Sequence, residues 1–327
     1  MTILITGSAG HLGEALARTL AGSADEVVGL DVLPSAFTTV VGSITDAALV
    51  RRCMRGVRTV FHTATLHKPH VATHRRQDFV DVNVTGTLTL LEAAAAEGVG
   101  AFVLTSTTSV FGAARVPPEG APAAWITEDV MPVAKNIYGV TKAAAEGLCQ
   151  LFQRNSGLAC VALRTSRFFP EEDDDRGVRE HYADGNAKAN EFLYRRVELE
   201  DVVGAHLLAA EHAPRPGFRT FIVSATTPFA PEDLAELRCD APSVLRRLVP
   251  EYEDEYRRRG WNMFPAIDRV YVNARARAEL GWAPRYDFRH VLQRLRAGEE
   301  PCSQLARQVG AKGYHPRPFA EGPYPVA

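Results

Sequence analysis

Short apolar runs alternate along this chain with longer segments whose apolar residues recur at helical spacing. The short runs predict strands at residues 2–6, 26–31, 39–43, 58–64, 101–106 and 159–166. The longer segments predict helices at residues 12–22, 83–98 and 138–157. Because the strands are apolar on both faces, this alternation indicates an α/β fold with a parallel sheet buried between two layers of helices.

The pattern changes after residue 165. Segment 168–186 is charged and irregular, so we predict a loop there. Residues 194–213 predict a strand followed by a helix, residues 219–225 predict a further strand, and the chain from residue 231 onward is largely helical. The last fifteen residues contain too many prolines and glycines for a helix.

Composition limits the class of protein. The 327 residues are 46% apolar, and 37 Lys and Arg stand against 39 Asp and Glu, so the net charge is −2. This balance gives no reason to expect a nucleic acid or an anionic membrane as partner. The five cysteines are scattered, the N-terminus lacks a signal-peptide pattern, and no apolar run reaches the roughly 18 residues of a membrane helix. We therefore expect a soluble cytoplasmic protein with reduced thiols.

The first predicted strand runs into the sequence TGSAGHLG, in which Gly7, Gly10 and Gly13 stand three residues apart. Glycines at a strand-to-helix turn let the backbone approach a pyrophosphate, which the helix N-terminus then faces. A glycine triplet is a weak signal alone, but its place between a strand and a helix predicts dinucleotide binding. Asp31 ends the next strand, where a carboxylate accepts hydrogen bonds from the adenosine ribose and repels a 2′-phosphate, so NAD is favoured over NADP.

Five hydroxyl residues stand together in the sequence LTSTTSVFG, at the end of the strand at 101–106. They either begin a polar loop or place a catalytic hydroxyl at the carboxyl end of a parallel strand, where such sheets bind ligands. The sequence YGVTK puts Tyr138 and Lys142 on one helix face, one turn apart. We expect the lysine ammonium to lower the pKa of the phenol, which then takes the proton of a substrate hydroxyl oriented by Thr107.

Together these motifs resemble the extended short-chain dehydrogenase/reductases of the NAD-dependent epimerase/dehydratase family. The resemblance runs from TGSAGHLG through NVTGTLTLLEAA, TSTTSVFG and YGVTK to YVNARARAELGWAPRYDF. It implies a Rossmann-type doubly wound parallel sheet with a smaller C-terminal substrate-binding lobe, and NAD as cofactor. It also implies a catalytic group of Thr107, Tyr138 and Lys142, with the tyrosine as general base. The implied cofactor-binding positions are Gly7, Gly10, His11, Leu12, Gly13, Asp31, Ser43, Ile44, Thr63, Ala64, Asn83, Tyr138 and Lys142.

Three departures from the family pattern narrow the expected substrate. Ser43 stands where relatives carry an Asp that holds adenine, so this contact is expected to be weaker. Thr108 and Ser109 stand where the 4,6-dehydratases of the family carry Asp-Glu, which argues against elimination of water. Arg167 and Pro170 replace an Asn and a Gly of the nucleotide-sugar enzymes, and the segment that follows is short. A smaller polyol, sugar acid or hydroxy-carbonyl substrate is therefore favoured.

The loop LHKPHVATHRR, residues 66–76, carries three histidines, one lysine and two arginines. It either forms an electropositive wall for an anionic substrate, with Arg167 adding a bidentate carboxylate contact, or is an ordinary solvated loop. We expect His67, Thr108 and Arg167 to contact the substrate. The histidines lack an accompanying Cys or carboxylate pattern, so no metal site is expected.

The sequence thus predicts an NAD-binding domain at 1–165, to which residues 195–225 return, and a substrate-binding lobe with C-terminal tail formed by 166–194 and 226–327. The expected activity is NAD-dependent oxidation of a secondary alcohol on a sugar, sugar acid or similar small polar substrate. A sugar epimerase that retains its NAD uses the same residues and stays open, as does a catalytically idle NAD-binding scaffold or sensor. The resemblance also implies a homodimer formed through the two long helices that include 83–98 and 138–157.

Overall fold

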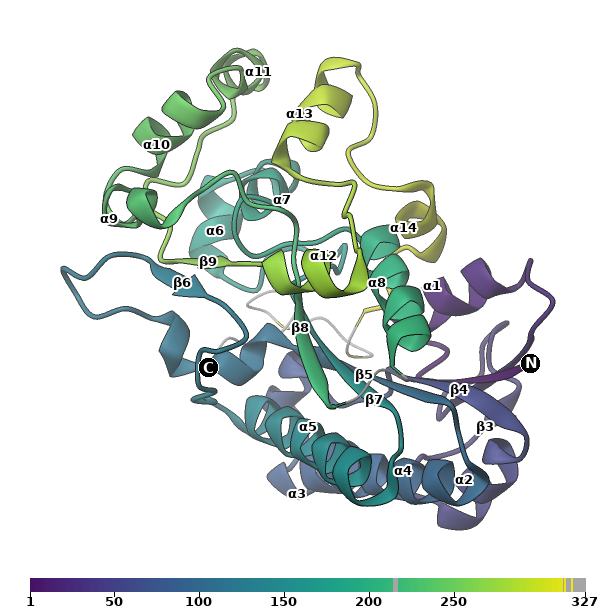
Figure 1. Ribbon diagram of the computed structural model, residues 1–327. Coiled ribbons are helices and arrows are strands. Elements are labelled where there is room, and N and C mark those ends of the chain that lie inside the picture. Colours follow the sequence, from purple (N-terminus) through teal and green to yellow (C-terminus); the bar gives the residue numbers. More distant parts are fainter. Residues whose placement is uncertain (214–216, 314, 316–318, 320–327) are drawn as a thin grey trace.

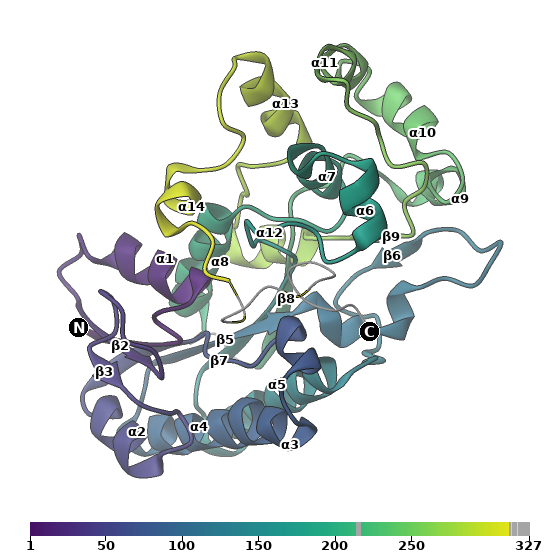
Figure 2. The same ribbon diagram turned by 180° about the vertical axis from the view of Figure 1, so that it is seen from behind.

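A computed structural model describes residues 1–213, 217–313, 315 and 319 of the chain. Its main sheet has seven parallel strands in the order β3-β2-β1-β4-β5-β7-β8 (Figures 1 and 2). These strands are β1 (Thr2–Thr6), β2 (Glu26–Asp31), β3 (Val40–Val41), β4 (Val57–His62), β5 (Ala101–Thr107), β7 (Cys160–Thr165) and β8 (Arg219–Val223). The strand order reverses between β1 and β4, and ligands of such sheets bind beyond the carboxyl ends of the strands at this point.

Two layers of helices cover the sheet, because successive strand residues point to opposite faces. Ile3 and Ile5 of β1 pack toward one layer, whereas Leu4 packs toward the other. The first layer contains α1 (His11–Leu20), α8 (Leu199–His212), α12 (Ala274–Leu280) and α14 (Gln304–Val309). The second contains α2 (Ala47–Met54), α4 (Gly86–Glu97) and α5 (Ile137–Ser156), with the short α3 (Arg76–Phe79) beside α5. The predicted Rossmann-type α/β fold is confirmed.

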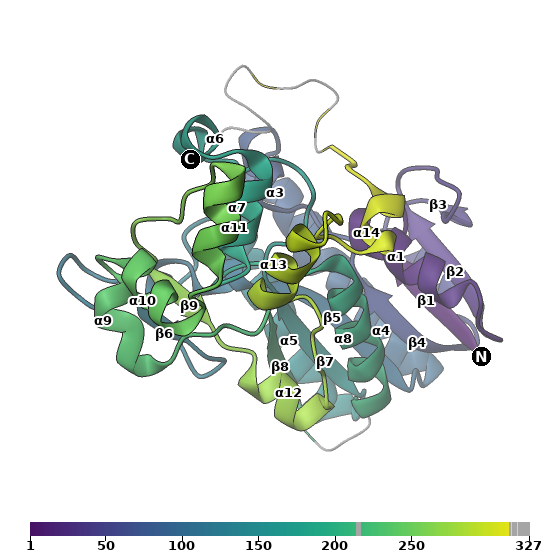
Figure 3. The same cartoon turned by 90° about the horizontal axis from the view of Figure 1, so that it is seen from above.

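A smaller lobe lies beyond the carboxyl ends of the strands and has a hydrophobic cluster of its own (Figure 3). Its helices are α6 (Arg176–His181), α7 (Asp184–Glu191), α9 (Leu234–Leu237), α10 (Ala241–Leu248), α11 (Tyr252–Arg259) and α13 (Phe288–Arg296). A parallel pair of strands, β6 (Ala124–Ile126) and β9 (Arg269–Tyr271), joins it to the segment after β5. The lobe therefore combines segments that are far apart in the sequence.

Short helical turns connect several of these elements. A π-helix at Val80–Thr85 precedes α4, and Gly98, with a φ of +66°, ends that helix. The 3₁₀ helices are Lys68–Ala72, Thr108–Phe111, Ala113–Arg115 and Pro231–Asp233. Among the described residues, no helix has both the length and the apolar character needed to cross a bilayer.

Two predictions of local structure were wrong. The segment 168–186 is not a loop throughout, because it contains α6 and the start of α7. The Asp175 side chain caps α6 by accepting hydrogen bonds from two backbone N–H groups, and the buried residues of α7 are Ala, Asn and Glu rather than large apolar side chains. The strand predicted before α8 is a single bridge between Arg167 and Arg196. The tail from residue 313 falls mostly outside the described residues.

Candidate functional site

The turn between β1 and α1 fits a dinucleotide pyrophosphate. Gly7 has a φ of +76°, and a Cβ added at Gly13 would lie 2.0 Å from the Gly7 carbonyl oxygen. A Cβ at Gly10 would meet only that oxygen, at 3.3 Å, so the space beside Gly10 is open. Gly10 caps α1, and because glycine has no side chain, the cap residue itself makes no side-chain hydrogen bond to the first turn of this helix. The N-terminus of such a helix suits an anion.

Asp31 lies beside this turn and fixes it. Its two carboxylate oxygens accept hydrogen bonds from the backbone N–H groups of Ala9 and Leu33, each at 2.9 Å. The Thr63 hydroxyl donates to the carbonyl oxygen of Thr6 at 2.7 Å, which holds the end of β4 against β1. An added Cβ at Gly7 would lie 2.7 Å from the backbone nitrogen of Ala64, so this glycine also allows the two strand ends to meet.

The other implied cofactor positions contribute in different ways. Leu12 and Ile44 are buried in the core, and Ser43 accepts a hydrogen bond from the Thr45 backbone N–H at 3.2 Å. Asn83 is buried. Its side-chain amide accepts a hydrogen bond from the Leu66 backbone N–H and donates one to the Leu66 carbonyl oxygen, each at 2.8 Å. It therefore positions the segment after β4 rather than presenting a free amide.

His11 forms a contact that the sequence did not indicate. Its Nε2 atom lies 2.9 Å from the Glu171 carboxylate, and both side chains are largely buried. Burial alone would raise the pKa of Glu171, but the hydrogen bond and charge of His11 outweigh it and bring the pKa to about 2. The β1–α1 turn is thereby tied to the segment after β7.

The hydroxyl residues at the end of β5 point in different directions. Thr105 bonds His206 of α8 at 2.8 Å, and Ser106 donates to Glu146 of α5 at 2.5 Å. Thr107 accepts a hydrogen bond from the Ser109 backbone N–H at 3.1 Å and lies close enough to the phenol of Tyr138 to lower its pKa. Of these three hydroxyls, the one at Thr107 therefore approaches the tyrosine.

The pKa values of the Tyr138–Lys142 pair differ from the expectation. Burial raises the pKa of Tyr138 to about 12, and the nearby Thr107 side chain offsets this only in part. Burial also lowers the pKa of Lys142 to about 8, although Glu146 and Cys149 act in the opposite direction. In the chain alone, desolvation therefore outweighs any effect of the ammonium on the phenol.

A cavity of about 560 Å³ opens between the sheet and the lobe. Thr107 and Tyr138 line it, together with His67, Thr108 and Arg167, the three residues predicted to contact substrate. In all, its wall contains six cationic side chains, Arg167 among them, and four aspartates, so the cavity suits a polar molecule. Lys142 lies behind this wall and is fully buried.

Comparison with known proteins identifies the family. Residues 3–223 match the NAD dependent epimerase/dehydratase family. The chain belongs to this family. It is accordingly an NAD-dependent enzyme of the oxidoreductase/epimerase type, as predicted.

Relatives of this epimerase/dehydratase family member cover most of its length. It is 26% identical to 3-beta-hydroxysteroid dehydrogenase of Mycolicibacterium neoaurum, over 86% of this chain and 87% of that one. It is 24% identical to UDP-glucose 4-epimerase of Corynebacterium glutamicum, over 90% and 94% of the two chains. A crystal structure of a short-chain dehydrogenase/reductase superfamily protein from Agrobacterium tumefaciens with bound NAD superposes with a TM-score of 0.65 at 25% identity, over 94% and 99% of the two chains.

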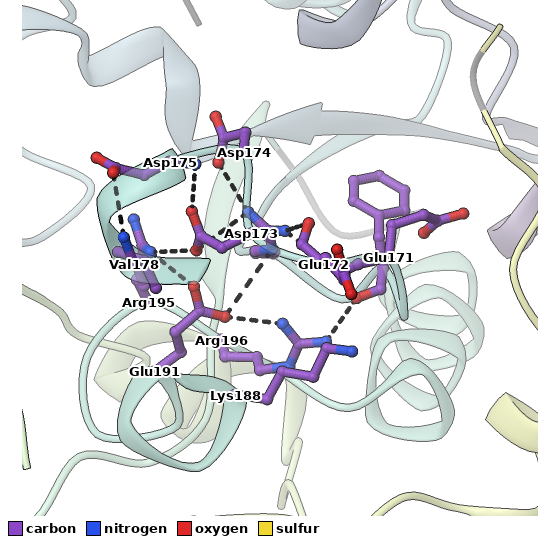
Figure 4. Close-up of polar contacts among 12 residues, drawn as sticks. Glu171, Glu172, Asp173, Asp174, Asp175, Val178, Lys188, Glu191, Arg195 and Arg196 are labelled. Atoms are coloured by element: carbon purple, nitrogen blue, oxygen red, sulfur yellow. Dashed lines mark hydrogen bonds and ion pairs between the residues drawn. The ribbon is translucent and has the colours of Figure 1, made fainter. Parts of the chain in front are cut away.

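A buried ion-pair network occupies one side of the cavity of this family member (Figure 4). Arg195 lies between Asp173 and Glu191, at 2.8 and 2.7 Å, and Arg196 also pairs with Glu191 at 2.8 Å. Arg167 donates to Asp174 at 3.0 Å. Arg167 lines the cavity, but its charge is already neutralised within the chain by Asp173 and Asp174.

The basic loop at residues 66–76 does not present an electropositive wall to the cavity. Lys68 pairs with Asp174 of the network. Burial lowers the pKa of His67 well below its ordinary value and that of His70 to about 4, so both rings are neutral at pH 7. Arg75 pairs with Asp78 at the surface. His67 therefore offers the cavity a neutral hydrogen-bonding ring rather than a cation.

Four residues of the opposite wall were not found from the sequence. They come from three separate segments, and although Tyr271 begins a stretch that carries the family resemblance, no motif marks any of the four as a cavity residue. They are Arg115, Arg238, Arg269 and Tyr271.

Proposed function

We propose that this protein is an NAD-dependent oxidoreductase acting on a secondary alcohol of a sugar, sugar acid or similar polar substrate. The observation that supports this best is the neighbouring pair of Thr107 and Tyr138 in the wall of a cavity rich in charged and polar side chains. An apolar, steroid-like substrate would leave many of these groups without partners, which carries a large desolvation cost.

Tyr138 is proposed to exchange a proton with the substrate oxygen, and Thr107 to orient that oxygen by a second hydrogen bond. With a pKa of about 12, Tyr138 keeps its proton at neutral pH in the chain alone, so removal of a substrate proton needs additional positive charge nearby. Lys142 is one source of that charge, since it lies one helical turn away. NAD, when bound, supplies the hydride acceptor and, in its oxidised form, a further positive charge.

Epimerisation is a second candidate, because a chain segment lies against the β1–α1 turn. The Lys312 and Gly313 backbone N–H groups donate to Glu171 at 3.0 and 3.2 Å, and the Lys312 ammonium pairs with Glu14 of α1. Such a segment would slow exchange of a dinucleotide, and an epimerase needs a retained cofactor.

A substrate panel of sugars, sugar acids and hydroxy acids tests both candidates. A dehydrogenase accumulates NADH, measured by absorbance, whereas an epimerase interconverts isomers without net reduction. Tyr138→Phe should lower either rate by about 100- to 10,000-fold while the circular dichroism spectrum stays the same. Full activity of this variant would contradict the proposed role of Tyr138.

A further inference from the structure

The cavity wall formed by the lobe has a different charge balance from the wall formed by the ion-pair network. On the network side, Lys68, Arg167 and Arg195 each have an aspartate partner. The lobe side of the wall contains three arginines, Arg115, Arg238 and Arg269. Among the described lining residues, one aspartate, Asp268, stands beside them. Asp268 binds Arg269, by two contacts of 2.7 and 2.8 Å. Within the described residues, no carboxylate pairs with Arg115 or Arg238.

The backbone brings two of these arginines, Arg238 and Arg269, to one place. Ile267 donates its N–H to the Leu237 carbonyl at 2.8 Å, which sets the end of α9 and Arg238 beside Asp268 and Arg269. The Arg269 guanidinium lies over the rings of Tyr194 and Tyr271, at 5.7 and 5.9 Å from their centroids. Stacking of this kind holds a guanidinium in one orientation and leaves its edge available for an acceptor.

Two buried polar atoms on this wall have no partner of hydrogen-bonding geometry in the described part of the chain. They are the hydroxyl of Tyr271, whose side chain is 1% exposed, and the Nε atom of Arg269. Unpartnered buried polar atoms are rare because each costs about 1–3 kcal/mol. Burial alone would raise the pKa of Tyr271, but the charges of Arg269 and Arg115, together with the approach of the Arg115 and Thr108 side chains to the hydroxyl, outweigh it and the net shift is downward. The surroundings of this phenol are therefore positive.

We infer that Arg115, Arg238, Arg269 and Tyr271 form a binding site for an oxyanion of the substrate, either a carboxylate or a phosphate. This inference rests on the proposed function, since it assigns an anionic group to the molecule whose alcohol meets Tyr138. Arg238, Arg269 and Tyr271 belong to the lobe, and Arg115 belongs to the segment after β5. This site, rather than Arg167 or the loop at residues 66–76, would supply the positive charge that an anionic substrate needs.

Calorimetric titration of the NAD-saturated protein tests this site, because NAD keeps the probes away from the β1–α1 turn. The probes are inorganic phosphate, inorganic diphosphate and glucuronate, with glucose as the neutral control. We expect at least one anion to bind and glucose to bind at least tenfold more weakly. Binding of phosphate but not glucuronate identifies a phosphorylated substrate, and the reverse identifies a sugar acid. Failure of all three anions to bind would overturn the inference.

Single variants locate the site. Arg238→Gln and Arg115→Gln should each weaken anion binding about tenfold or more, since a charge-assisted hydrogen bond is lost. Arg277→Gln is the matched control, because this arginine lies exposed on α12 and outside the cavity wall. It should change affinity less than twofold. Equal losses in Arg238→Gln and Arg277→Gln would reflect net charge alone and contradict a localised site. Unchanged melting temperatures show that the variants fold.

The outcome is separable from that of the proposed function. Tyr138→Phe should bind the anions as tightly as the wild type. If no alcohol in the panel is oxidised or epimerised but Arg238→Gln still loses anion binding, the oxyanion site stands and the proposed reaction falls.

Discussion

At the residue scale, Lys142 combines complete burial with a nearby carboxylate. Burial lowers its pKa from the ordinary 10.5 to about 8, with Glu146 acting in the opposite direction. The folded chain therefore binds fewer protons than the unfolded chain between pH 8 and 10.5, and this lysine makes stability rise with pH in that window. At pH 7 the buried ammonium lowers the free energy of unfolding. Lys142 therefore points to a role other than stabilising the fold.

We expect Lys142→Met to raise the free energy of unfolding at pH 7, by up to about 3 kcal/mol, because the variant removes a buried charge. The difference from the wild type should shrink as pH rises from 8 to 10.5, where the wild-type lysine loses its proton. Urea unfolding at several pH values measures this, and loss of activity should accompany the gain in stability.

Lys135→Met is the matched control, since Lys135 is exposed just before α5. It should leave the unfolding free energy within about 0.5 kcal/mol of the wild type at every pH. A Lys142→Met variant that is no more stable than this control at pH 7 would show that the ammonium is well solvated or paired in the folded protein.

At the scale of elements, the β1–α1 turn depends on the absence of a side chain where helix and strand approach. An added Cβ at Gly13 would lie 2.0 Å from the Gly7 carbonyl oxygen of the same turn. This oxygen belongs to the backbone, so it cannot move away as the end of a flexible side chain could. Gly22, just beyond the other end of α1, has no heavy atom within 4 Å of an added Cβ. The two glycines therefore provide a matched pair for testing the turn.

We expect Gly13→Ala to weaken NAD binding at least tenfold and to lower the free energy of unfolding by about 1–3 kcal/mol, because the first turn of α1 must shift. Gly22→Ala should leave NAD affinity unchanged. Fluorescence titration with NADH and urea unfolding check the two quantities. Wild-type affinity in Gly13→Ala would mean that the dinucleotide does not bind against this turn.

At the scale of the whole molecule, α5 presents apolar side chains outward. Val140 is 51% and Leu151 38% exposed, and Met131 in the preceding segment is 78% exposed. Helix α4 packs beside α5 on the same side of the sheet (Figure 1). This face is where the family resemblance places the partner subunit, and exposed apolar side chains gathered on one face are typical of an interface.

We predict a homodimer, with a light-scattering mass twice the 35.7 kDa of one chain. Leu151→Glu should shift the protein toward monomer, because a charge at the interface centre is desolvated without a partner. Val116→Glu, at an exposed valine of the loop after β5, should stay dimeric. A monomeric wild type at working concentration, or equal dissociation in both variants, would exclude α5 as the interface.

Much of the architecture could be predicted from the sequence, since local patterns carry it. The strand at residues 2–6 and the helix at 138–157 coincide with β1 and α5 to within one residue. Helix α7 could not be predicted, because its buried side is made of small and polar residues. Helix α6 has only six residues and none of them is buried, so it carries no apolar periodicity. The pairing of β6 with β9 joins residues about 145 positions apart and has no local signal.

The sequence by itself determined the alternation of strands and helices up to β7, the glycine turn and the spacing of Tyr138 and Lys142, because periodicity and short spacings are properties of neighbouring residues. Only the tertiary structure decided which charges remain free. Arg167 is neutralised by Asp173 and Asp174, whereas Arg115 and Arg238 meet at one cavity from distant segments and have no acidic partner in the described chain. Charge interaction and desolvation depend on distance and burial in space, and neither can be read from sequence order.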